Sequence, residues 1–386
     1  MEAYLDNSAT TKPCDAVVQA MVAHMQTRYY NPSALYRPAM EVERDLVRAR
    51  QAVAEKLQVP DKSVIFTSGG TEADHLAIMG YMMAQRKGGT ILVSAAEHPA
   101  VKNACKEAAE QLAYTVKEIS LTSRGSLDLD ALEQLMNEST RLICVMQVCN
   151  ETGVIMPLEQ VAALRDRLCP EAAIHVDGVQ GFLRVPINLT ELGIQSYALS
   201  AHKIHGPKGV GALVIAHGHK LHPLMVGGGQ QGGMRGGTEN TAAIEGLRAA
   251  IEAYPHPAYS TTHMFALKNK MVEQLREAIP DMVVIGARPE ESQSAAHILM
   301  MALPPVRGET MVHALEQDEV YIGTGSACSS KKQKISPVLA AMGISPQLAE
   351  SVVRVSFSPH NSHVDVAYAT EQIIQRYKQL SRFRRR

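Results

Sequence analysis

The chain has 386 residues, a length that suits two domains or one large one. Its formal net charge is -1 and 20% of its residues are charged, so the overall charge gives no indication of a nucleic-acid or membrane partner. The apolar runs are too short to span a bilayer and the acidic start lacks the pattern of a signal peptide, so we expect a cytoplasmic protein.

Short apolar runs alternate with helical patterns over the first two-thirds of the chain. This alternation predicts an α/β fold with a mostly parallel sheet. The apolar runs predict strands at 64–67, 90–94, 113–119, 142–148, 173–177, 196–200 and 211–215, and the periodic segments predict helices at 71–86, 99–112 and 158–168.

The pattern changes after Pro255 and Pro257, which interrupt a helical stretch. Helices are predicted beyond them at 262–278 and 309–317, and strands at 296–303 and 352–358. This order suggests a smaller α+β domain. We therefore expect a large domain of residues 15–258 and a small domain made of residues 1–14 and 259–386.

A glycine-rich turn at 67–72 separates a predicted strand from a predicted helix. Glycines such as Gly70 let the backbone approach an anion, the helix N-terminus offers free N–H groups, and Thr71 adds a hydroxyl. The turn therefore suits a phosphate group. The alternative is that Thr71 simply caps the helix.

His98 follows the next predicted strand, in the run Ala-Glu-His-Pro. An imidazole there could stack on a cofactor ring and move protons, because its ordinary pKa lies near neutrality. The alternative is that His98 only begins the helix 99–112.

Asp177 ends a later predicted strand, and Lys203 follows the predicted strand after it. Lys203 ends the run Ser-Ala-His-Lys before a glycine-rich turn, which fits a lysine held to form a Schiff base with pyridoxal phosphate. A carboxylate such as Asp177 keeps the pyridine nitrogen of that cofactor protonated, and Gln180 can donate to the phenolic oxygen. A lone lysine or strand-end aspartate is more often structural, so it is their joint occurrence that favours the cofactor.

Cys328 differs from the other five cysteines, most of which should be small buried apolar residues. It lies in a small, polar loop where nearby lysines favour the thiolate, and Gly323 and Gly325 suit movement of this loop. An incidental loop cysteine is the alternative, but an exposed thiol is open to oxidation. No CxxC pair and no His/Cys cluster with zinc spacing occurs, so no metal is expected.

Arg354 lies in an alternating, strand-like run. It is either an edge residue that extends its charge to water or a bidentate clamp for a substrate carboxylate.

Together these motifs resemble the cysteine desulfurases of the class V aminotransferase family, which have the pyridoxal-phosphate fold type I. The resemblance runs through nearly the whole chain. It rests on the motifs at 4–11, 67–72, 97–98, 150–153, 177–180, 200–209, 235–240 and 325–328, and on Arg354.

The resemblance implies a role for each matching residue. Lys203 would form the Schiff base, and Cys328 would be the nucleophile that accepts sulfur from L-cysteine, with His98 moving protons. The phosphate would be bound by Gly70, Thr71, Ser200 and His202, and Thr238 would reach the phosphate of the neighbouring subunit in a homodimer. The cofactor ring would be contacted by Asp177, Gln180 and His98. The substrate would be bound by Asn7, Asn150 and Arg354.

The chain departs from the family pattern at two places, and the second of them bears on the sulfur acceptor. Cys149 replaces a usual asparagine while Asn150 stays in place, and the residues after Cys328 include Lys331, Lys332 and Lys334. The basic loop makes the chain look more like desulfurases that feed tRNA thiolation or thiamine synthesis, through a tRNA sulfurtransferase, than those that serve an iron–sulfur scaffold. A selenocysteine lyase, another class V aminotransferase and a non-catalytic scaffold remain the alternatives.

Overall fold

The computed structural model describes residues 1–85, 88–324 and 335–382. The predicted nucleophile Cys328 and the lysines at 331, 332 and 334 lie outside the described residues.

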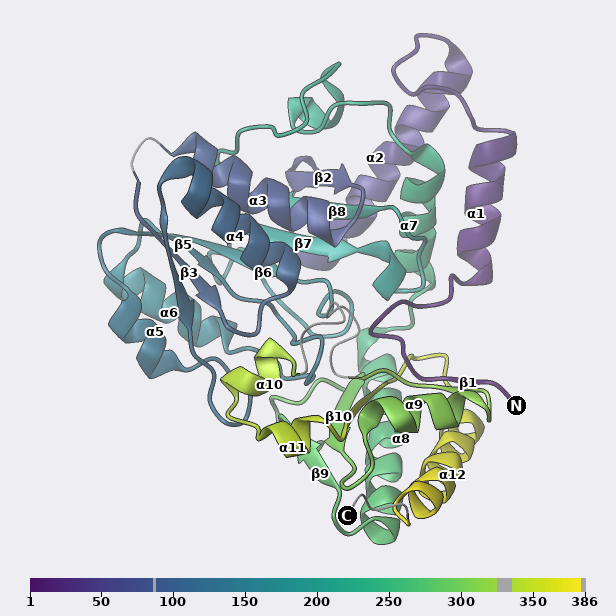
Figure 1. Cartoon of the computed structure of the whole chain (residues 1–386). Coiled ribbons are helices and arrows are strands. Elements are labelled where there is room, and N and C mark those ends of the chain that lie inside the picture. The colour runs from purple at the N-terminus through teal and green to yellow at the C-terminus, as the bar shows by residue number, and fades with distance from the viewer. Residues whose placement is uncertain (86–87, 325–334, 383–386) are drawn as a thin grey trace.

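A seven-stranded sheet forms the centre of the larger part of the molecule (Figure 1). Its strand order is β2-β8-β7-β6-β5-β3-β4, and β8 alone runs antiparallel to its neighbours. The mostly parallel sheet and the α/β fold are therefore confirmed. The strands are β2 (Val64–Thr67), β3 (Thr90–Ser94), β4 (Thr115–Ile119), β5 (Thr140–Cys144), β6 (Ala173–Asp177), β7 (Ser196–Ser200) and β8 (Gly211–Ile215).

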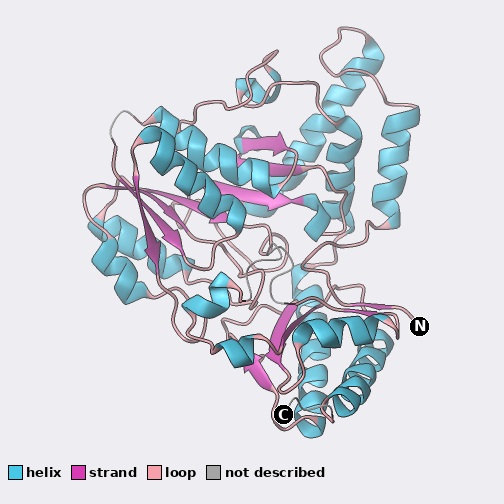
Figure 2. Cartoon of the chain, in the orientation of Figure 1, coloured by secondary structure: helices cyan, strands magenta, loops and turns pink. Residues whose placement is uncertain are grey.

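Helices cover both faces of this sheet (Figure 2), so its central strands are apolar on both sides and read as continuous hydrophobic runs. One face packs against α3 and α4, and the larger core on the other face includes residues of α1, α2, α6 and α7. The helices are α1 (Asp15–Gln26), α2 (Arg37–Leu57), α3 (Gly70–Ala84), α4 (Pro99–Leu112), α5 (Leu129–Leu135), α6 (Leu158–Leu168) and α7 (Thr241–Ala253), and three 3-10 turns are η1 (Asp61–Ser63), η2 (Ala201–Lys203) and η3 (Gln230–Gly233).

A second core lies around a three-stranded antiparallel sheet of order β12-β10-β9, with α8, α9 and α12 against it. The N-terminal strand β1 joins this part by pairing in parallel with β11. The elements are β1 (Ala3–Tyr4), α8 (Pro257–Ala278), β9 (Val283–Ile285), β10 (Ile298–Ala302), α9 (Gly308–Glu316), β11 (Val320–Tyr321), α10 (Pro337–Ala341), α11 (Pro346–Ala349), β12 (Val352–Ser356) and α12 (His363–Leu380). The division into domains at residue 258 stays a prediction.

Several element ends differ from the prediction for local reasons. Strand β4 begins at Thr115 rather than at 113, because Ala113 has a φ of 57° and ends α4 in the left-handed conformation. Strand β5 ends at Cys144, and the next residues stay buried, which explains why the apolar run continues to 148. Helix α8 begins at Pro257 rather than at 262, since proline suits the first position of a helix.

Helices α1 and α2 are joined by ion pairs around a buried carboxylate. Asp45 on α2 accepts from Nε of Arg28 (2.6 Å) and faces Nε2 of His24 on α1 (3.1 Å). Its other oxygen accepts from Arg48. Asp45 is thus compensated on both oxygens despite its burial, which keeps the cost of the buried charge low.

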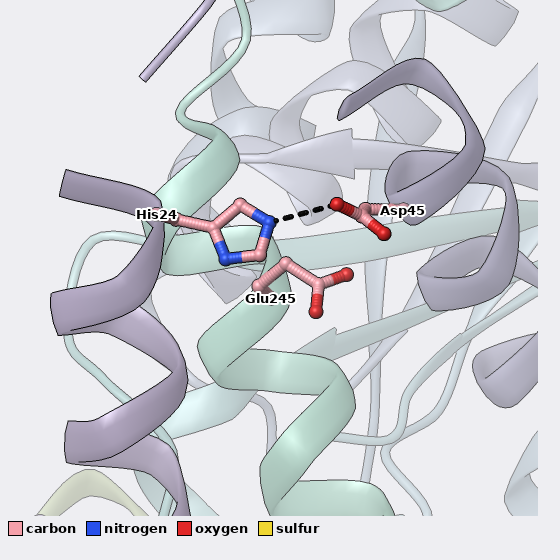
Figure 3. Close-up of side chains that lie close together, drawn as sticks. All are labelled: His24, Asp45 and Glu245. Carbon is pink, nitrogen blue, oxygen red and sulfur yellow. Dashed lines mark hydrogen bonds and ion pairs between the residues drawn. The ribbon is translucent and has the colours of Figure 1, made fainter. Parts of the chain in front are cut away.

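Glu245 on α7 extends this cluster (Figure 3). Ligand-type atoms of His24, Asp45 and Glu245 lie within 4.8 Å of one another, an arrangement that could hold a metal ion. Arg248 already pairs with Glu245 (2.8 Å), and arginines occupy both oxygens of Asp45. Because these guanidinium groups would repel a divalent cation, we assign the cluster a structural role between three helices.

No helix in the described ranges combines the length and the apolar character that crossing a membrane requires.

Candidate active site

Lys203 lies on η2, directly after β7. Its Nζ donates to the backbone oxygens of Ser8 (2.6 Å) and Ala9 (2.8 Å). Burial, with smaller effects of Arg354 and Arg184, lowers its pKa to about 8. The fold therefore holds this amine in place and increases the share of its neutral, nucleophilic form relative to an ordinary lysine.

Asp177 ends β6, the neighbouring parallel strand, so its carboxylate lies at the same sheet edge as Lys203. Its Oδ1 accepts from the backbone N–H of Val179 (2.9 Å). Burial raises the pKa of Asp177, while the Val179 bond and the charges of His98 and Lys203 lower it. A buried carboxylate of this kind would be stabilised by a protonated ring nitrogen beside it.

His98 does begin α4, as the structural alternative proposed. Its Nδ1 accepts from the backbone N–H of Ala100 (3.1 Å), so the neutral ring carries its proton on Nε2. Burial lowers the pKa of His98, and the charges of Asp177 and Lys203 act on it in opposite directions. Capping the helix and facing the site are compatible, because one ring nitrogen is enough for the cap.

The glycine-rich turn packs against the ends of two other strands. A Cβ at Gly70 would lie 2.7 Å from Val179 Cγ2 and 3.8 Å from Ser200 Cβ, so only glycine allows this close approach. The cap position of α3 belongs to Gly69 and not to Thr71, so the proposed capping role of Thr71 is wrong. The N-terminus of the 15-residue helix α3 thus opens beside Ser200.

The N-terminal residues 8–10 also contact two further residues predicted to bind the cofactor, Gln180 and His202. Gln180 donates from Nε2 to the oxygen of Ser8 (3.0 Å), and Nδ1 of His202 lies 3.1 Å from Oγ1 of Thr10. Burial, followed by the charge of Lys203, lowers the pKa of His202 to about 4, so its ring is neutral. Nothing in the sequence pattern indicated that the carbonyls of Ser8 and Ala9 would hold Lys203.

Arg354 is central in β12 and its side chain is only 3% exposed, so the water-exposed edge position is wrong. Its Nη1 donates to the backbone oxygen of Asn150 (2.8 Å), and its Nη2 pairs with Oδ1 of Asp6 (2.9 Å). Asn7 donates from Nδ2 to the oxygen of Ser356 (2.9 Å), a bond that joins the N-terminal segment to β12. The electrostatic influence of Arg354 on Lys203 shows that the two cations face one region.

One predicted residue, Thr238, is not brought into this group, and a second, Cys328, is not described. Thr238 is exposed on the connection between β8 and α7. Cys328 falls in the stretch 325–334, outside the described residues.

The residues present fit pyridoxal phosphate. A helix N-terminus with a glycine cradle suits the phosphate, a buried carboxylate suits the ring nitrogen, and a lysine with a lowered pKa suits the aldehyde. Asp177 and Lys203 follow the carboxyl ends of the neighbouring strands β6 and β7, and the glycine-rich turn follows β2, which is separated from β7 by β8. The carboxyl ends of parallel strands are where open α/β sheets bind ligands.

Comparisons with known proteins agree with this geometry. The family profile described as aminotransferase class-V matches residues 3–368. The cysteine desulfurase of Nostoc sp. (strain PCC 7120) is 34% identical over 99% of this chain and 95% of its own length. The cysteine desulfurase NifS of Azotobacter vinelandii is 36% identical over 95% of this chain and 90% of its own length.

Solved structures show the same similarity. A structure named NifS-like protein has a TM-score of 0.91 and 31% identity, covering 98% of this chain and 100% of its own. A structure of SspA in complex with cysteine has a TM-score of 0.80 and 27% identity, covering 93% of this chain and 100% of its own.

Proposed function

This chain belongs to the class-V aminotransferase family. We propose that it is a pyridoxal-phosphate-dependent cysteine desulfurase. It converts L-cysteine to L-alanine and keeps the sulfur as a persulfide on Cys328. Lys203 carries the assignment, because its buried amine, with a lowered pKa, is held by two carbonyls within the influence of Asp177, His98 and Arg354.

Pyridoxal phosphate supplies the electron sink for this reaction when bound. Lys203 would hold its aldehyde carbon, Asp177 its ring nitrogen and His98 its ring face. The phosphate would lie at Gly70, Thr71, Ser200 and His202, with Gln180 at the phenolic oxygen.

The protein groups then act on the substrate. Arg354 and Asn150 fix the carboxylate of L-cysteine, with Asn7 close by. The neutral amine of Lys203 takes the Cα proton, and Nε2 of His98 exchanges protons with the substrate thiol.

Sulfur transfer falls to the Cys328 thiolate. It forms an S–S bond with the substrate sulfur as the Cβ–S bond breaks, and the electron pair of that bond stays with carbon. The carbon takes up a proton and leaves as L-alanine. The net change is L-cysteine plus thiol to L-alanine plus persulfide, which needs no outside oxidant.

The first experiment measures L-alanine and sulfide from L-cysteine and a reducing thiol, for the wild type and Cys328→Ala side by side. Equal amounts of both products from the wild type, and none from the variant, are expected. Alanine formation at the full rate by Cys328→Ala would remove Cys328 from the scheme. A cofactor-loaded wild type that forms no alanine would point to selenocysteine or to a transamination pair.

We further propose that the enzyme is a homodimer in which Thr238 reaches the phosphate of the neighbouring subunit. Large apolar side chains are exposed on α1, at the start of α2 and on the chain between them, which supports this because exposed apolar groups often mark the site of a partner. They are Val18, Val22, Met25, Leu35, Tyr36 and Met40. Sedimentation velocity of the wild type and of Val22→Glu tests the idea, and two monomeric samples would contradict it.

The sulfur acceptor is proposed to be a protein with an acidic surface, because Lys331, Lys332 and Lys334 follow the persulfide cysteine in the sequence. Reversing these charges should slow sulfur transfer to a tRNA sulfurtransferase or an iron–sulfur scaffold while alanine formation with a free thiol stays the same. Unchanged transfer to both acceptors would exclude docking through these lysines. The cytoplasmic location stays a prediction.

A further inference from the structure

The guanidinium group of Arg354 is held from two sides in the free protein. Nη1 donates to the backbone oxygen of Asn150 (2.8 Å) and Nη2 to Oδ1 of Asp6 (2.9 Å). Its Nε is buried and has no partner within the described ranges. Two of the five N–H groups therefore fix the plane of the guanidinium, and others remain for a ligand.

Asp6 is fixed in turn by the backbone. Its neighbour Leu5 accepts from the backbone N–H of Ser356 (2.7 Å) and donates to Tyr321 (2.8 Å), and Asp6 itself forms a parallel bridge with Ser356. The hydroxyl of Tyr4 also lies 3.2 Å from the backbone oxygen of Asp6. These bonds bring a carboxylate from the start of the chain to an arginine 348 residues away.

Gly323 lies beside the ion pair between Asp6 and Arg354, and its lack of a side chain leaves room for that pair. Its backbone N–H donates to the oxygen of Arg354 (2.9 Å), and its backbone oxygen accepts from the N–H of Arg354 (2.7 Å). Gly323, which the sequence suggested as a point of loop movement, is therefore hydrogen-bonded to β12. A Cβ at Gly323 would lie 2.9 Å from Oδ1 of Asp6 and 3.2 Å from Nη2 of Arg354. Any side chain there would press on both partners of the ion pair.

We propose that Asp6 is a positioning residue that orients Arg354 and balances its charge for the carboxylate of the amino-acid substrate, and that Gly323 keeps the room for this pair. The inference rests on the proposed function, in which Arg354 binds that carboxylate. An arginine that is 3% exposed needs a compensating charge, and a planar guanidinium recognises a carboxylate only in a defined orientation.

A competing role for Asp6 predicts the opposite sign. If Asp6 only occupied Arg354 in place of the substrate, its removal would free the guanidinium and tighten binding. The Michaelis constant therefore separates the two roles.

The test compares Asp6→Asn with the wild type in the full, cofactor-loaded protein. The KM for L-cysteine, measured by alanine formation, should rise by about tenfold, the loss of one charge-assisted hydrogen bond, with a smaller change in kcat. Binding of cysteamine, which lacks the carboxylate and is followed by the absorption of the cofactor, should be unchanged. Glu2→Gln is the matched control, since Glu2 is an exposed acid of the same segment and its variant should leave KM unchanged.

Gly323→Ala provides a second test without removing a charge. It should raise the KM for L-cysteine and spare cysteamine binding as well. An unchanged or lower KM in Asp6→Asn, or equal weakening of L-cysteine and cysteamine, overturns the inference. An unchanged KM for L-cysteine in Arg354→Lys would overturn the proposed carboxylate site itself. A raised KM in Arg354→Lys, together with an unchanged KM in Asp6→Asn, would overturn the role of Asp6 alone.

Discussion

Replacing Lys268 by methionine tests how the protein holds a buried amine away from its active site. Lys268 on α8 is 1% exposed, and its Nζ donates to Oγ of Ser294 (2.7 Å) and to the backbone oxygen of Ala295 (2.9 Å). No carboxylate pairs with it in the described part of the chain. Burial lowers its pKa from 10.5 to about 7, with a small opposing effect of Glu290.

This shift makes stability depend on pH in a defined direction. Between pH 7 and 10.5 the unfolded chain binds the Lys268 proton and the native chain does not, so the free energy of unfolding rises with pH. The shift of roughly 3.5 pKa units corresponds to about 5 kcal/mol in total. About 2 kcal/mol of this should appear between pH 7 and 9, because Lys268 in the native protein titrates near pH 7.

Urea unfolding of the wild type and Lys268→Met, followed by circular dichroism at pH 7, 8 and 9, measures this contribution. Other titrating groups are shared and cancel in the difference. The wild type should gain about 2 kcal/mol relative to the variant as the pH rises from 7 to 9. Parallel pH dependences for the two chains would show that Lys268 keeps its proton in the native state, and the argument from burial would be refuted.

Three further substitutions give direct outcomes. Asp177→Asn should lower alanine formation from L-cysteine by at least about 100-fold, because the ring nitrogen loses its anionic partner; a near-normal rate would assign that partner elsewhere. Asp45→Ala should lower the free energy of unfolding by about 2 kcal/mol, as it removes the buried acceptor that His24, Arg28 and Arg48 share, and thermal unfolding at neutral pH measures the loss. Gly178→Ala should lower the melting temperature, because its Cβ would lie 1.8 Å from Cζ of the buried Tyr197, and an unchanged temperature would mean that this ring moves freely.

Much of the large sheet could be predicted because its strands are buried on both faces. The bounds of β2, β6, β7 and β8 match the apolar runs, and their polar ends place Asp177 and Lys203 at one edge. Helix α2 was not predicted, although its buried apolar positions follow the three- and four-residue spacing of an amphipathic helix: Ala39, Val42, Leu46, Ala49, Val53 and Leu57.

The contacts that complete the site have no local signal. The carbonyls of Ser8 and Ala9 that hold Lys203 belong to backbone that any residue supplies, so no residue type marks them. The pair between Asp6 and Arg354 joins residues 348 positions apart, and only the fold brings them together. Sequence patterns therefore predicted side chains for the site, and missed the backbone and acidic groups that hold them in the structure.

The N-terminal segment that closes the site also sets the order in which the site can form. Lys203 meets its carbonyl partners across 195 residues, and Arg354 meets Asp6 across 348. At roughly 5–20 residues per second of synthesis, residue 6 waits about 20 to 70 s for residue 354. The large sheet can fold during that time, but the pair between Asp6 and Arg354 cannot form, because a long-range contact requires that both of its ends have left the ribosome. The nascent chain can therefore hold Lys203 before it can hold Arg354.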